Sequence, residues 1–132
     1  MDKSMSTHSF VLQGEFTDLN TYINAERSNR FMGAKIKREE TERVMWSLTK
    51  APKLKGKFYM RFCWYSKNSR KDPDNIAFAK KFILDGMVKI GMIENDTQEF
   101  IIGLSDSFYV DKLRPRVVVS LYSYPFGDPT DR

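Results

Sequence analysis

The chain has 132 residues, enough for one domain with a single core, so we expect one domain over residues 1–132. A hydrophobic fraction of 41% excludes a disordered chain, and no apolar run approaches the roughly 20 residues that span a bilayer. The net charge is +5, and a single cysteine and a single histidine exclude both an internal disulfide and a Cys/His zinc site within one chain. The first eight residues lack the apolar core of a signal peptide, so we expect a soluble, cytoplasmic protein without membrane contact.

The first half of the chain predicts one strand and two helices. Residues 9–12 favour a short strand, and a helical stretch follows with Thr17 or Asp18 as its N-cap. Residues 28–48 favour a helix because they are rich in Arg, Lys, Glu and Met and contain no proline. Their apolar positions are sparse, which indicates a helix on the surface of the domain. Pro52 and Gly56 end this helical segment.

The second half predicts three strands and one helix. Residues 57–65 alternate in polarity, which is typical of a strand. Apolar residues at helical spacing predict a helix over residues 73–90, and residues 100–104, with an extension to 109, and 116–122 predict two more strands. The resulting order is β-α-α-β-α-β-β. It predicts an α+β fold, a small mixed β-sheet with helices packed on it.

Basic residues concentrate in the middle of the chain. Residues 43–71 contain nine lysines and arginines and no acidic residue. Such a block is a solvated surface in many proteins, but here it leads directly into an acidic cluster, which favours a polyanionic partner. The candidate DNA-binding residues are Lys53, Lys55, Lys57, Lys67, Arg70 and Lys71, and Lys112, Arg114 and Arg116 extend that surface.

The acidic cluster begins with Asp72-Pro73-Asp74-Asn75 and allows two interpretations. A hard cation such as Mg²⁺ requires oxygen ligands, and carboxylates also supply the negative charge. The same residues form an ordinary helix start, with Asp72 as the N-cap and Pro73 at the first helical position. On one continuous helix Asp74, Lys81 and Asp85 would share a face. Lys81 and Asp85 form either a surface ion pair or a site where the lysine contacts the scissile phosphate.

Residues 72–98 contain an ordered series of motifs: Asp72-Pro73-Asp74-Asn75, then Lys80-Lys81-Phe82-Ile83-Leu84-Asp85-Gly86-Met87, Gly91, and Glu94-Asn95-Asp96-Thr97-Gln98. This series resembles the RusA family of Holliday junction resolvases, which is common in phages and prophages. The resemblance implies that Asp72, Asp74 and Asp96 bind the catalytic metal.

The resemblance also implies roles for the residues between those aspartates. Lys81 would be the catalytic lysine, with Lys80 as its competitor because the intervening helix looks one turn longer than in the shorter relatives. Asn75 and Asp85 would support the site. The family has two acids where this chain has Asn95 and Asp96, which leaves Asp96 as the ligand.

The function implied by the resemblance is a Mg²⁺-dependent endodeoxyribonuclease, with Mn²⁺ as a substitute, that cuts branched DNA in recombination and repair. A four-way junction has two-fold symmetry, so paired cuts require a C₂ homodimer. Two other classes stay open. One is a non-catalytic nucleic-acid-binding protein, and the other is a metal-dependent phosphodiesterase that acts on RNA or another nucleic-acid structure.

Overall fold

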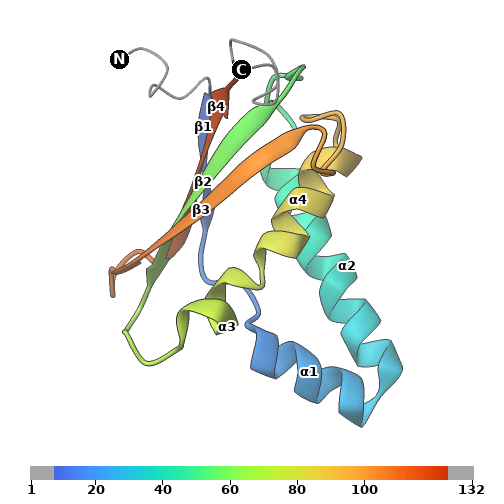
Figure 1. Ribbon diagram of the computed structural model, residues 1–132. Coiled ribbons are helices and arrows are strands. Elements are labelled where there is room, and N and C mark those ends of the chain that lie inside the picture. Colours follow the sequence, from blue (N-terminus) through green and yellow to red (C-terminus); the bar gives the residue numbers. More distant parts are fainter. Residues whose placement is uncertain (1–7, 125–132) are drawn as a thin grey trace.

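The computed structural model describes residues 8–124 and shows four helices on one face of a four-stranded sheet (Figure 1). The elements in chain order are β1 His8–Gln13, α1 Leu19–Ser28, α2 Arg30–Ser47, β2 Phe58–Ser66, α3 Pro73–Ala77, α4 Lys80–Lys89, β3 Ile101–Val110 and β4 Arg116–Ser123. The predicted α+β class and the order of strands and helices are confirmed, except that the third predicted helix is two helices.

The sheet is mixed, with the strand order β1-β4-β2-β3. β2 is antiparallel to β4 and parallel to β3, and β1 is antiparallel to β4. The predicted alternation in β2 is confirmed, because its core-facing side chains are at most 2% exposed. These core-facing residues are Phe58, Met60, Phe62 and Trp64.

The parallel pairing of β2 and β3 requires a long crossover, and α3 and α4 supply it. α4 carries the main apolar face of the helical layer, with Phe82, Ile83 and Met87 buried against the sheet. α2 packs on α4 at Gly86, where a Cβ atom would lie 2.6 Å from Val44 Cγ1. The missing side chain at Gly86 therefore sets how closely these two helices approach.

The predicted helix over residues 73–90 is wrong in one respect, because it breaks at Phe78 and Ala79. The Ala79 amide donates to the Ile76 carbonyl at 3.2 Å and the Lys81 amide to the Phe78 carbonyl at 3.1 Å, so bonds of three-residue spacing interrupt the helical ladder. Tertiary packing accompanies the break, since the Phe78 ring lies 5.2 Å from that of Tyr22 on α1. The expected common face of residues 74, 81 and 85 therefore does not extend across the break.

The N-cap of α1 is one of the two residues that the sequence offered for this role. The Asp18 carboxylate accepts a hydrogen bond from the Thr21 amide at 2.8 Å, which identifies Asp18 rather than Thr17 as the N-cap. Within residues 8–124, none of the helices combines the length and the apolar character needed to cross a membrane.

Candidate functional site

Asp72 and Asp74 lie where the chain leaves β2 and enters α3. Both residues are exposed, and within residues 8–124 neither carboxylate has a hydrogen bond or an ion pair. Pro73 takes the first helical position as expected, but the Asp72 side chain makes no capping hydrogen bond although Asp72 is the N-cap residue. Capping therefore does not account for either carboxylate.

Asn75 ties this acidic turn to the start of α1. Its side-chain oxygen accepts a hydrogen bond from the Asn20 amide at 2.9 Å. The loop before the turn is held at the same place, because the Lys67 amide donates to Glu15 at 2.7 Å. The acidic turn is thus fixed by contacts with the segment that precedes and opens α1.

Lys71 belongs to the same anchor. Its ammonium group lies 2.8 Å from the Asp18 carboxylate and 3.7 Å from that of Glu15. Burial would raise the pKa of Asp18, but hydrogen bonds from Lys71 and Thr21 outweigh it and hold that pKa below its usual value. The hydrogen bond to Asp18 raises the pKa of Lys71 in turn. The charge of Lys71 is therefore compensated by Asp18 and Glu15, and this predicted DNA-contact residue has a structural role.

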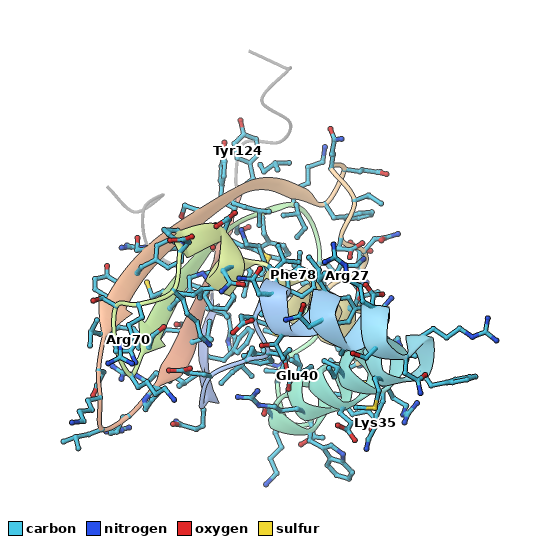
Figure 2. All side chains as sticks on the ribbon, turned by 90° about the horizontal axis from the view of Figure 1, so that it is seen from below. Arg27, Lys35, Glu40, Arg70, Phe78 and Tyr124 are labelled. Atoms are coloured by element: carbon cyan, nitrogen blue, oxygen red, sulfur yellow. The ribbon has the colours of Figure 1, made fainter. Side chains whose placement is uncertain are left out.

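Other basic side chains near the acidic turn have no acidic partner among residues 8–124. Lys67 and Arg70 are exposed and precede the turn, and Arg70 lies at the side of the molecule away from α1 and α2 (Figure 2). The Asp111 amide donates to the Ser66 carbonyl at 2.8 Å, which places the β3–β4 turn, with Lys112 and Arg114, beside the same loop. Lys67, Arg70, Lys112 and Arg114 therefore lie on two adjoining loops at the end of the sheet that holds the acidic turn, and we call these four residues the cationic rim.

A groove of about 240 Å³ runs beside the acidic turn. Its walls come from the loop after β2, from Pro73 in α3 and from Phe108 and Val110 at the end of β3. Phe108 is 38% exposed and Val110 is 56% exposed, so the groove has an apolar wall next to a charged rim.

Asp96 lies at the opposite end of the sheet. Asp72 follows the C-terminal end of β2, whereas Asp96 precedes the N-terminal end of the parallel strand β3. A nine-residue strand at about 3.3 Å per residue separates these ends by roughly 26 Å. Figure 1 shows the same arrangement, with the loop between α4 and β3 far from α3. In the part of the chain that the structure describes, no three His, Cys, Asp or Glu side chains are grouped to hold a metal ion.

The predicted DNA-binding run is divided between the two ends of β2. The loop with Lys53, Lys55 and Lys57 precedes β2 and lies at the end of the sheet that holds Asp96. Its backbone binds the acidic loop directly, because the Gly56 amide donates to the Glu94 carboxylate at 3.2 Å. Consecutive basic residues in the sequence therefore form two surfaces rather than one.

Lys80 and Lys81, the two candidates for the catalytic lysine, have different surroundings. The Lys80 ammonium group lies 2.6 Å from Asp106 of β3, and the second oxygen of Asp106 accepts a hydrogen bond from the Trp64 indole at 2.8 Å. Lys81 is 58% exposed and lies 3.5 Å from Asp85, as the i, i+4 spacing predicts. Lys80 thus joins α4 to the sheet, and Lys81 is the more exposed of the two lysines.

Asp106 is a site residue that sequence reasoning missed. It faces the helices, opposite Phe62 in the register of β2 and β3. The available signal was a single carboxylate on the core-facing phase of a strand, because a charge at such a position requires a partner.

Neither the protein-family models nor the curated proteins provide a match to this sequence. Whether the predicted carboxylates suit Mg²⁺ can be judged from their number and placement. Mg²⁺ keeps several waters and is commonly held by one or two carboxylates together with substrate phosphates. Asp72 and Asp74 fit that description, whereas the full set with Asp96 does not form within one chain.

Proposed function

We propose that this protein is a Mg²⁺-dependent endodeoxyribonuclease of the RusA type that acts as a homodimer on four-way DNA junctions. The observation that carries the proposal is the acidic turn, in which Asp72 and Asp74 are exposed and have no partner within the described chain. Carboxylates without a protein partner are available as oxygen ligands for a divalent cation, which is commonly held by one or two of them. Lys67 and Arg70 support the proposal, because their side chains have no acidic partner in the described part of the chain and supply the attraction for a phosphodiester.

In this proposal, different residues bind the metal, the flanking phosphates and the phosphate that is cleaved. Asp72 and Asp74 would hold the metal, which would supply Lewis-acid chemistry for phosphodiester hydrolysis. Lys67, Arg70, Lys112 and Arg114 bind the flanking phosphates in the cationic rim. Lys81 is the exposed lysine that contacts the phosphate at the site of cleavage.

A second candidate is a non-catalytic nucleic-acid-binding protein. The separation of Asp96 from Asp72 and Asp74 favours it, because two carboxylates alone make a weaker metal site than three. The basic surfaces would bind a polyanion in the same way in this second case.

Incubation of a synthetic immobile cruciform with the purified protein, with and without Mg²⁺, separates the two candidates. The nuclease gives paired nicks only with the metal, and Asp72→Asn abolishes the nicks while the protein still binds the junction. Glu39→Gln, on the exposed surface of α2, removes the same charge elsewhere and should cleave as the parent does.

Failure of the parent protein to cut junction, duplex, single-stranded DNA or RNA at any Mg²⁺ or Mn²⁺ concentration, with binding intact, supports the binding protein instead. Cleavage of RNA or of unbranched DNA in preference to the junction would overturn the proposed substrate while retaining a metal-dependent nuclease.

A further inference from the structure

The face of the sheet that is turned away from the helices has no covering layer within residues 8–124 (Figure 1). Directly paired residues on neighbouring strands point to the same side of a sheet, so the register defines this face. We call it the open face. Its residues are Ser9, Val11 and Gln13 of β1, Arg116, Val118, Ser120 and Tyr122 of β4, Tyr59, Arg61, Cys63 and Tyr65 of β2, and Gly103, Ser105, Ser107 and Tyr109 of β3.

The open face combines aromatic rings with small residues and contains no carboxylate. Tyr59 is 43% exposed and Tyr109 is 41% exposed. The Tyr59 ring lies across the neighbouring strand, because a Cβ atom at Gly103 would be 2.5 Å from Tyr59 Cδ1. Beside it is a hollow of about 250 Å³, lined by Tyr59, Arg61, Gly103, Ser105 and Tyr122 among others. The Tyr59 ring itself covers Gly103, so the ring forms part of the wall of this hollow.

The two cations of the open face differ in their partners. Arg116 is neutralised by Asp111 at 2.8 Å and lies over the Tyr65 ring at 3.9 Å. Arg61 is exposed and donates to the Tyr109 hydroxyl at 3.4 Å, and it has no carboxylate partner in the described chain. Arg61 is therefore an uncompensated positive charge among tyrosines at the rim of the hollow.

These features favour a nucleic acid over a second copy of the chain as the occupant. In a symmetric dimer the open face would meet itself, and Arg61 would find no carboxylate among the facing strand residues. The face is also rich in serine and tyrosine rather than in large aliphatic residues, unlike the core of an obligate interface. Tyrosine rings beside an unpaired arginine match the two parts of a nucleotide, the base and the phosphate.

We propose that the open face binds unpaired nucleotides, with a base stacked on Tyr59 in the hollow next to Tyr122 and the adjoining phosphate held by Arg61. Stacking on an aromatic ring tolerates any base, so this site selects single strands rather than a sequence. The site needs no metal and lies on a different surface from Asp72 and Asp74. It would give the protein a contact for a strand that has lost its pairing, as at a branch point.

Fluorescence anisotropy of labelled oligothymidine, in EDTA so that no cleavage occurs, tests the proposal. Tyr59→Ala should weaken binding about tenfold, the order expected for one lost base stack, whereas Tyr59→Phe retains the ring and most of the affinity. Arg61→Gln should weaken binding and lower the slope of log affinity against log salt by about 0.7, one phosphate's share on a single strand. Trp46→Ala, which removes a 77% exposed aromatic side chain from α2, is the matched control and should bind as the parent does.

Unchanged affinity in both Tyr59→Ala and Arg61→Gln, with circular dichroism showing folded proteins, would overturn the proposal. Equal competition by duplex DNA would also overturn it, because paired bases cannot stack on the protein. A dimer that dissociates in Tyr59→Ala during sedimentation would show that the open face is an interface between copies. Oligothymidine binding without any cruciform cleavage would refute the proposed nuclease but leave this site supported.

Discussion

Lys71 illustrates how a predicted DNA-contact residue acquires a structural role. Its ion pair with Asp18 joins the loop after β2 to the N-cap of α1, and the Asp18 side chain is only 12% exposed. The depressed pKa of Asp18 means that the pair stabilises the fold above the unfolded pKa of that carboxyl, near 3.8. The raised pKa of Lys71 means that its contribution is complete below its unfolded value of 10.5 and is lost as the pH rises further.

Asp18→Asn should therefore destabilise the protein by about 1 kcal/mol near neutral pH, because asparagine still caps the helix but cannot pair with Lys71. The difference should shrink as the pH falls through the folded-state pKa of Asp18, since protonation removes the same ion pair from the parent. Urea unfolding of both proteins across the acidic range measures it. A difference that stays constant down to strongly acidic pH would contradict this assignment, and Glu39→Gln should show no such dependence.

Lys80 and Lys81 are adjacent in the chain but have different environments. Lys80 is held by Asp106 between α4 and the sheet, and Lys81 points to solvent with Asp85 as its neighbour. Exposed ion pairs on helices contribute only a few tenths of a kcal/mol, so the Lys81 pair is easily opened by a phosphate. This contrast, which the sequence left undecided, favours Lys81 for the proposed catalytic role.

At the scale of elements, the crossing of α2 and α4 depends on the absence of a side chain at Gly86. A Cβ atom there would meet Val44 Cβ at 2.7 Å and the Thr41 carbonyl oxygen at 3.1 Å, so both side chain and backbone would have to move. Glycine is otherwise unfavourable inside a helix by about 1 kcal/mol relative to alanine. The close approach explains its presence.

Gly86→Ala should destabilise the protein by about 1–3 kcal/mol, because overpacking outweighs the gain in helix propensity. The midpoint of urea unfolding, measured with circular dichroism, reports the change. Gly33→Ala on α2 is the comparison, since the atoms that it would meet belong to the exposed Glu26 side chain rather than to buried side chains or backbone. Equal effects of the two substitutions would show that the α2–α4 crossing is not as closely packed as the structure indicates.

At the scale of the whole molecule, β2 separates the two halves of the predicted site. Asp72 and Asp74 lie beyond one end of the strand, and Asp96 lies beyond the other. In the proposed homodimer the three aspartates can share a metal only if Asp96 of one protomer reaches the acidic turn of the second. The three-aspartate site implied by the resemblance to RusA nucleases therefore requires a dimer in which each metal site is shared between protomers.

Mixed dimers test whether the metal site is shared between protomers. If the site is shared, Asp72→Asn and Asp96→Asn should each be inactive alone, and a co-refolded mixture should regain about one quarter of the parent's active sites by random pairing. Paired and single nicks in the cruciform assay provide the measurement. Full activity of Asp96→Asn alone would remove that residue from the metal site, and an inactive mixture would refute sharing between protomers.

The sequence by itself determined the local features of this protein. The two-residue alternation of β2, a helix cap at Thr17 or Asp18 and the i, i+4 contact between Lys81 and Asp85 were predictable, because each depends on residues within a few positions of one another. The break at Phe78 was not predictable, since the surrounding apolar spacing continues through it while a ring on α1 packs against it.

Only the tertiary structure decided which distant residues meet. The parallel pairing of β2 with β3 carries Asp96 away from Asp72, and it brings Asp106 to Lys80 across the layers. A sequence gives the period of a strand but not the direction of its neighbour, and that direction determines which end of the sheet each following loop reaches. The same pairing created the open face, whose tyrosines come from three strands and are scattered along the chain.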